Sequence, residues 1–352
     1  MSDSSDSRAS FWQADLATAT LLPVAKPRLP TAARILPYLE QVDRAQWYSN
    51  GGGLVLEFEG RLARHCGKAE AQVATVANGT LGLTLALLAF DLPEGSLCMV
   101  PSWTFAATAH AILLAGLTPW MVDVSSKTWI LEAEAARELL KRAPGQVGAV
   151  IPVSAFGAPL DLGPWQRFRA ETGIAVVADA AAAFDTIRAN EIPAVVSLHA
   201  TKVCGIGEGG FVVSTDQAFI EEIRKRANFG FWNSRESTAP SFNGKLSEYG
   251  AAVGLASLDE WSETRADFLR VARAYRQNLA GHDDIQLQPA FGESWVSSTT
   301  VIESRSKDAE TLTNLLTENG IGSRRWWGGG LHRHRRFQAY PRDHVAVTEA
   351  LA

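Results

Sequence analysis

Two long segments without charged residues constrain the fold of this chain more than any other feature. Neither Ala71–Phe90 nor Ser96–Val122 contains an Asp, Glu, Lys or Arg residue, and each is long enough to cross a bilayer. The first, however, contains Asn78-Gly79-Thr80, and the second contains two prolines and several hydroxyl side chains, which a lipid-facing helix does not carry. We therefore expect buried strand–helix units rather than membrane spans, with helices packed inside the subunit or against a dimer partner.

The charge balance and the cysteines narrow the class of protein further. The chain has 33 basic and 38 acidic residues, a balance that argues against bulk electrostatic binding of nucleic acid or membranes. The Ser-rich sequence MSDSSDSRAS lacks the apolar core of a secretory signal, and residues 1–14 are predicted to be a disordered tail. Three scattered cysteines argue against a disulfide framework and against a clustered zinc or iron–sulfur site. We expect a cytoplasmic protein with no metal site.

From residue 73 onward, short apolar segments alternate with helical ones. Strands are predicted at 73–77, 97–101, 118–122, 148–153, 174–178, 194–198 and 210–214. Helices are predicted at 31–46, 54–66, 79–90, 104–115, 132–142, 162–172, 216–228 and 235–260, with a long one from 261. Apolar strands that alternate with helices are typical of an α/β fold with a mostly parallel sheet covered on both faces. The expected domains are a large one with an N-terminal helical arm, residues 15–250, and a smaller α+β one, residues 251–352.

Polar residues that directly follow the predicted strands form the candidate site, because open α/β sheets bind ligands beyond the carboxyl ends of their strands. Asp179 follows the strand at 174–178, where a buried carboxylate needs a cationic partner. Lys202 lies between the strand at 194–198 and a glycine-rich loop, and a lysine in partly dry surroundings can form a Schiff base. A buried ion pair for Asp179 and a solvated loop position for Lys202 are the ordinary alternatives. Taken together, the two residues favour a catalytic pair.

Two further strand ends complete the candidate site. Asn78-Gly79-Thr80 opens a helix whose free N–H groups favour a phosphate, although an ordinary helix cap explains this motif as well. Trp103 follows the strand at 97–101 and can stack on a flat ring, whereas core packing is its ordinary role. A phosphate site, an aromatic face, a carboxylate and a lysine are the parts that a pyridoxal 5'-phosphate (PLP) site needs. The residues therefore predict PLP as the cofactor.

Four motifs between residues 48 and 254 occur together in one order. They are Asn78-Gly79-Thr80, Pro101–Thr108 (PSWTFAAT), Ala178–Ala181 (ADAA) and Ser197–Gly210 (SLHATKVCGIGEGG). In this order they resemble the DegT/StrS family of sugar aminotransferases, which are PLP enzymes of fold type I. The resemblance implies that Lys202 forms the internal aldimine and moves the proton, while Asp179 contacts the pyridinium nitrogen.

The same resemblance implies the remaining cofactor contacts and a partner. Trp103 would stack on the cofactor ring, and Gly79, Thr80 and Ser197 would hold its phosphate. Segment 242–248 resembles the part of the family that reaches into the partner subunit's site, with Asn243 on the phosphate. The implied functional unit is a homodimer with shared active sites.

Substrate contacts are also implied by the resemblance. Segment 323–332 resembles the substrate-side segment of the family, with glycines in place of its usual proline. Ala182 stands where the family has Gln or another polar residue near the cofactor's phenolic oxygen, and Lys245 stands where Arg is usual. The basic cluster at 333–336 is most simply a solvated turn. The substrate-binding candidates, chosen to meet a diphosphate and a flat base, are Lys245, Arg324, Arg325, Trp326 and His332.

These features predict a ping-pong aminotransferase that moves an amino group from glutamate to a keto group of a nucleotide-linked deoxysugar. Such sugars belong to cell-surface polysaccharide or secondary-metabolite biosynthesis. One alternative is a PLP-dependent sugar dehydratase on the same fold, but such enzymes replace the lysine with histidine or add an iron–sulfur cluster. Lys202 and the scattered cysteines argue against both features. The other alternative is a catalytically silent regulatory or scaffold protein, which the departure at Ala182 supports.

Overall fold

The computed structural model describes residues 22–67 and 69–352, so the predicted tail at 1–14 lies outside the described residues. The described chain forms two compact units. The larger unit comprises residues 27–303 and 327–352, and the smaller one comprises residues 22–26 and 304–326. The predicted boundary between residues 250 and 251 falls inside helix α9, Glu248–Asp259, and the division into 15–250 and 251–352 stays a prediction.

The seven predicted strand regions form eight strands of a mostly parallel sheet, because the region predicted at 174–178 is divided into β5 and β6. Their bounds are β1 Gln72–Val76, β2 Leu97–Pro101, β3 Thr118–Val122, β4 Val147–Val150, β5 Ala175–Val176, β6 Ala178–Asp179, β7 Ala194–Ser197 and β8 Gly210–Ser214. Neighbouring strands follow the orders β3-β2-β4-β5 and β1-β8-β7-β6. Hydrogen bonds from the N–H groups of Val177 and Asp179 to the carbonyls of Val150 and Pro152 join the two parts. Among the described strands of this sheet, β8 alone runs in the opposite direction to the others, so the predicted fold class is confirmed.

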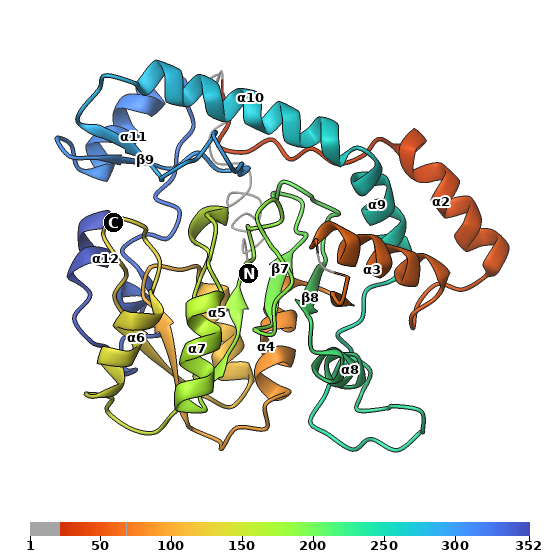
Figure 1. The fold of residues 1–352 in the computed structure, drawn as a ribbon. Helices are drawn as coiled ribbons and strands as arrows, with labels where there is room; N and C mark the ends of the chain where they lie inside the picture. The colour runs from red at the N-terminus through yellow and green to blue at the C-terminus, as the bar shows by residue number, and fades with distance from the viewer. Residues whose placement is uncertain (1–21, 68) are drawn as a thin grey trace, which may run out of the picture. The chain divides into compact units, whose positions relative to one another are not determined.

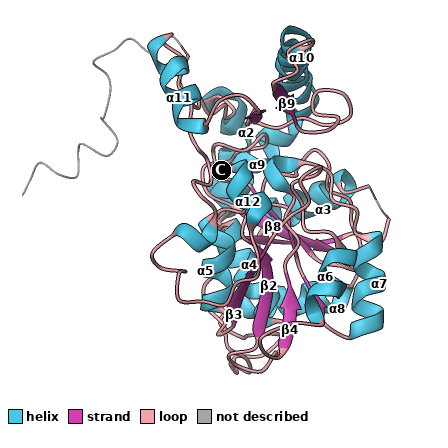
Figure 2. Ribbon diagram, turned by 90° about the vertical axis from the view of Figure 1, so that its left-hand side faces the viewer, coloured by secondary structure: helices cyan, strands magenta, loops and turns pink. Residues whose placement is uncertain are grey.

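Helices cover both faces of this sheet. The helices on one face are α4 Gly79–Leu88, α5 Ala106–Leu114 and α8 Gln217–Arg226, which share a buried cluster with the strands. Those on the other face are α3 Gly53–His65, α6 Ala133–Leu140 and α7 Gly163–Thr172. Figure 2 shows α4 and α5 on one side of the strands and α6 and α7 on the other. Because both faces are covered, every residue of β2 is buried, as the uncharged run at 96–122 predicted.

The N-terminal helices pack on the segment that follows the sheet. Helices α2 (Ala32–Ala45) and α3 contact α9, and α10 (Trp261–Leu279) continues from α9 (Figure 1). The buried Glu248 side chain accepts the N–H of Leu54 at 2.8 Å and so caps the start of α3. The remaining elements are β9 Ile285–Leu287, β10 Ile302–Ser304, α11 Ala309–Glu318 and α12 Ala346–Leu351, with short 3-10 turns at Ala155–Gly157 and Leu331–Arg333.

One predicted helix is wrong over half of its length. The sequence pattern predicts a helix over 235–260, but the helix in the structure begins only at Glu248. Pro240 and Gly244 disfavour a helix before that point, and the Ser247 side chain accepts the N–H of Gly250 and caps the helix there. Residues 235–247 instead form an irregular segment whose Gly244 carbonyl accepts the N–H of Ala77 at 2.7 Å, beside the end of β1.

The helix in the second uncharged run is buried on one side only. Thr108, Ala109, Ala111 and Ile112 of α5 are buried, whereas Phe105 and Leu114 are 57% and 62% exposed. The interior packing of this helix is therefore as predicted, and its contact with a dimer partner stays a prediction. Within the described residues, no helix combines the length and the apolar character that crossing a bilayer requires.

Candidate active site

Asp179 is a buried carboxylate at the end of β6, with 5% of its surface exposed. Its oxygens accept hydrogen bonds from the Thr108 hydroxyl at 2.7 Å and from the Ala181 N–H at 3.0 Å. Because Thr108 donates its proton to Asp179, the Thr104 hydroxyl at 2.9 Å must donate to Thr108. Burial raises the pKa of Asp179, while these two donors and the charge of Lys202 act in the opposite direction.

Lys202 lies on the loop between β7 and β8, at the same edge of the sheet. The loop is closed on itself by backbone hydrogen bonds, including Ala200 N–H to the Gly207 carbonyl at 2.8 Å. A Cβ at Gly205 would lie 2.7 Å from the Ala200 carbonyl oxygen, so this close turn requires glycine. Burial lowers the pKa of Lys202, and the negative charge of Asp179 only partly offsets that effect. The structure thus brings the predicted catalytic pair into one electrostatic environment.

The start of α4 packs tightly against β7 and β8. Asn78 caps the helix by accepting the Leu81 N–H at 2.9 Å, which leaves the N–H groups of Gly79 and Thr80 without acceptors inside the helix. A Cβ at Gly79 would lie 3.1 Å from the Ser197 Cβ, and one at Gly210 would lie 3.0 Å from the Gly79 nitrogen. The predicted phosphate residues Gly79, Thr80 and Ser197 therefore lie together, at the edge that also carries Asp179.

Trp103 is buried after β2, in an aromatic cluster that sequence reasoning found only in part. Its ring meets the rings of Phe156 and Trp327 edge-on at centroid distances of 6.3 and 5.2 Å, and those two rings stack at 3.9 Å. Among the described residues, the buried Trp103 Nε1 has no hydrogen-bond acceptor. Phe156 has a φ of +56°, and beside it a Cβ at Gly157 would lie 2.6 Å from the Ala182 carbonyl. The adjacent Trp326 and Trp327 indicate an aromatic contribution from this segment, but the sequence does not reveal that Trp327 is the buried one of the two.

Asn243 and Lys245 lie on the irregular segment beside the end of β1. Asn243 is exposed and pairs through its backbone with Asn228. The Lys245 ammonium donates to the Asn228 side chain at 2.9 Å and lies 4.8 Å from the centre of the Phe229 ring. Burial lowers the pKa of Lys245. The cofactor role of Asn243 and the substrate role of Lys245 stay predictions.

The other substrate-binding candidates fall in different surroundings. Arg324, Arg325 and Trp326 are exposed and belong to the smaller unit, and their roles stay predictions. His332 belongs to the larger unit and is only 3% exposed. Its Nδ1 lies 2.7 Å from the Ser102 hydroxyl, so this ring is bonded to the residue before Trp103.

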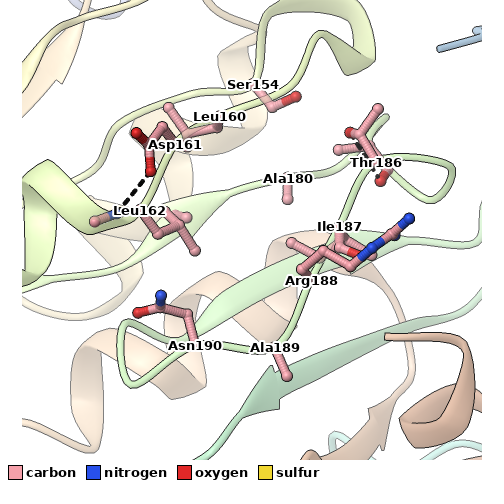
Figure 3. Close-up of a pocket in the computed structure, with 13 residues that line it drawn as sticks. Ser154, Leu160, Asp161, Leu162, Ala180, Thr186, Ile187, Arg188, Ala189 and Asn190 are labelled. Atoms are coloured by element: carbon pink, nitrogen blue, oxygen red, sulfur yellow. Dashed lines mark hydrogen bonds between the residues drawn. The ribbon is translucent and has the colours of Figure 1, made fainter. Parts of the chain in front are cut away.

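A cavity of about 260 Å³ lies on the other face of β6 (Figure 3). Ala178 and Ala180 line it, whereas Asp179 between them points to the opposite face, as alternation along a strand requires. Figure 3 shows Asp161 and Asn190 on one side of this cavity and Arg188 on another, around the small side chains of Ala180 and Ala189. The cavity is therefore separate from the edge where Asp179 and Lys202 meet.

A family model, the DegT/DnrJ/EryC1/StrS aminotransferase family, matches residues 31–352. The chain belongs to this aminotransferase family. GDP-perosamine synthase of Caulobacter vibrioides is 31% identical over 314 residues, which cover 86% of this chain and 83% of the relative.

Solved structures of similar proteins support the same assignment. The crystal structure of DesI in the presence of its TDP-sugar product has a TM-score of 0.83 and 30% identity, covering 97% of this chain and 88% of DesI. A proposed PLP-dependent aminotransferase of Bacillus cereus ATCC 10987 has a TM-score of 0.88 and 27% identity, covering 94% and 92% of the two chains. The family, the fold type I architecture and the aminotransferase class expected from the sequence are thereby confirmed.

Proposed function

We propose that this aminotransferase binds PLP and transfers an amino group from glutamate to a keto group of a nucleotide-linked deoxysugar. One observation carries the proposal: Asp179 and Lys202 are held in partly dry surroundings at the sheet edge where α4 presents its free N–H groups. The names of two relatives, a GDP-perosamine synthase and DesI with its TDP-sugar product, support a nucleotide sugar as the substrate class.

The residues at this edge fit PLP. The close packing of Gly79, Ser197 and Gly210 leaves a small-residue cradle beside the α4 N–H groups for a phosphate. Trp103 supplies an aromatic surface, and its Nε1 has no hydrogen-bond acceptor in the part of the chain that the structure describes. The buried Asp179 suits a protonated ring nitrogen. When bound, PLP supplies an aldehyde for covalent attachment and a ring that accepts electrons from the reacting carbon.

The residues around the proposed cofactor site have different roles. Burial lowers the pKa of Lys202 and so favours the neutral amine, which would hold the cofactor through its aldehyde. When not attached to the cofactor, the same amine would carry the proton. Asp179 would hold the ring nitrogen of the cofactor protonated, and the Thr108 hydroxyl orients the Asp179 carboxylate by donating to it. Trp103 limits the movement of the ring and keeps water from that face.

The decisive experiment combines cofactor binding with a substrate panel. Purified protein titrated with PLP should turn yellow, and glutamate with a set of dTDP-, UDP- and GDP-linked ketosugars should give the aminated sugar and 2-oxoglutarate. Uptake of PLP without turnover on any sugar would instead support the catalytically silent alternative. A protein that takes up no PLP would contradict the whole proposal.

Thr108→Val should weaken PLP binding by up to about tenfold, because Asp179 loses a charge-assisted donor. The pKa of Asp179 is already raised by burial and should rise further. Since a carboxyl group loses its charge as the pH falls through its pKa, the deficit should grow toward acidic pH. PLP titrations across the pH range measure this dependence. Thr84→Val, which removes a buried hydroxyl bonded only within α4 at 3.0 Å, should leave the affinity unchanged.

We also propose a homodimer in which Asn243 completes the partner's site. Support comes from the exposed apolar side chains of Phe105, the residue before α5, and Leu114, the last residue of α5, and from the exposed position of Asn243. Equal amounts of Lys202→Ala and Asn243→Ala chains, each inactive alone, should regain about a quarter of wild-type activity on mixing. Half of the dimers are then mixed, and each has one intact site of two. No recovery in verified mixed dimers would place Asn243 in its own chain's site.

A further inference from the structure

Ser102, the residue before Trp103, is held by the segment that leads to the C-terminal helix. Ser102 is fully buried, and its carbonyl accepts the N–H of Leu331 at 2.8 Å. Its hydroxyl oxygen accepts the N–H of His332 at 3.3 Å, and its own N–H donates to the Val122 carbonyl at 2.7 Å. The backbone that carries Trp103 is therefore attached on one side to β3 and on the other to residues 331 and 332.

The His332 ring extends this attachment to helix α12. Its Nε2 lies 3.3 Å from a carboxylate oxygen of Glu349, which also receives the Arg333 guanidinium at 2.5 Å. A carboxylate only accepts hydrogen bonds, so Nε2 carries the proton, and Nδ1 of the neutral ring accepts the Ser102 hydroxyl proton. Burial lowers the pKa of His332, which favours this neutral form. A continuous hydrogen-bond chain thus runs from Glu349 to the residue beside Trp103.

Two further contacts hold α12 in this place. Asp123, which follows β3, accepts the N–H groups of Val347 and Thr348 at 2.7 and 2.8 Å and so caps the helix. Gly330 has a φ of +86°, and a Cβ there would lie 2.6 Å from the Thr348 side chain and 3.1 Å from the Ser102 carbonyl. The turn at Gly330 therefore packs closely between α12 and the backbone of Ser102, and only glycine fits there.

We propose that His332 is a positioning residue, which through Ser102 fixes the loop that carries Trp103 and thereby holds the cofactor-facing indole in place. The proposal rests on the function proposed above, in which Trp103 contacts the PLP ring. Because Trp103 Nε1 has no acceptor among the described residues, its indole is oriented by packing and by its backbone alone. The orientation of the Trp103 indole therefore depends on the position of Ser102 and on the edge contact with Trp327. His332 would then act on the cofactor from outside the substrate pocket.

The test compares Ser102→Ala, His332→Gln and the double variant. Each single change should raise the dissociation constant for PLP about five- to tenfold and alter the visible circular dichroism of the bound cofactor. Amide hydrogen exchange of a peptide covering 101–104 should accelerate in the cofactor-free protein. The double variant should be no worse than either single one, because both changes break the same chain. Glu349→Gln, at a half-exposed position, should give a two- to threefold effect, and Glu318→Gln on α11 should give none.

Several outcomes would overturn the proposal. If His332→Gln raises KM for the nucleotide sugar but leaves PLP affinity, dichroism and amide exchange unchanged, His332 contacts the substrate directly. Unchanged amide hydrogen exchange at 101–104 in both Ser102→Ala and Glu349→Gln would also contradict the proposal. The Glu349→Gln variant is included because Ser102→Ala changes a fully buried residue and could fail to fold. A wild-type protein without PLP affinity would overturn the proposed function, whereas the exchange measurement would still test the attachment of the loop.

Discussion

Lys202→Ala should reduce transamination by about 10³-fold or more, because the substitution removes the amine that we propose attaches the cofactor and moves the proton. The variant should still bind PLP, but the visible absorption of the covalently attached cofactor should disappear. Steady-state rates with glutamate and the accepted nucleotide ketosugar measure the loss of turnover, and absorption spectra measure the loss of attachment.

Two companion variants make the Lys202 result specific. Lys202→Arg keeps a positive charge but has no amine that can attach an aldehyde, so it should be as inactive as the alanine variant. Lys141→Ala removes an exposed lysine paired with Glu138 on α6 and should leave both rate and spectrum unchanged. Turnover of Lys202→Ala within tenfold of wild type would contradict the assigned role.

Asp179→Asn should lower turnover by about 10² to 10⁴-fold, because the ring nitrogen of PLP would lose the carboxylate that we propose keeps it protonated. The local structure should survive this change. Asn can still accept the Ala181 N–H, and its amide can donate to Thr108, whose hydroxyl rotates to suit. The measurement is kcat with saturating PLP, together with the absorption spectrum of the bound cofactor.

A second buried aspartate provides the contrast. Asp185 forms an ion pair with Arg265 at 2.5 Å and accepts the Val296 N–H at 3.0 Å. Asp185→Asn should lower the free energy of unfolding by about 2 kcal/mol with little effect on kcat, the reverse of Asp179→Asn. Equal effects of the two substitutions on stability and turnover would show that Asp179 acts only as a structural residue.

Removal of the Asp179 charge should also change the pH dependence of stability in the cofactor-free protein. The pKa of Asp179 is raised in the folded state, so between its ordinary value and the raised one the folded state binds more protons and stability falls as the pH rises. The lowered pKa of Lys202 has the opposite sign, since stability rises between that lowered value and the ordinary value of 10.5. Asp179→Asn should therefore lose the acidic part of this profile and keep the alkaline part.

Much of the sheet could be predicted because its signals are local. Uncharged, apolar strands with polar residues at their ends predict a sheet buried on both faces, as β2 shows, and they also locate Asp179 and Lys202 at one edge. The helix predicted from 235 was wrong over its first half, because the apolar and glycine pattern there does not reveal that the Gly244 carbonyl accepts the N–H of Ala77, just after β1. Contacts between distant segments decide such a region, and these leave no periodic signal.

The sequence by itself determined the family, because the order of the motifs around Asn78, Trp103, Asp179 and Lys202 was enough to indicate it. The same motifs predict the PLP site that we propose. Only the tertiary structure decided what surrounds these residues. It shows that the Thr108 hydroxyl donates to Asp179, and that Trp327 rather than Trp326 contacts Trp103. His332 is buried against Ser102, 230 positions away, and its predicted contact with the substrate stays a prediction. The physical reason is that burial and hydrogen-bond partners depend on packing across long sequence separations, which a local pattern does not encode.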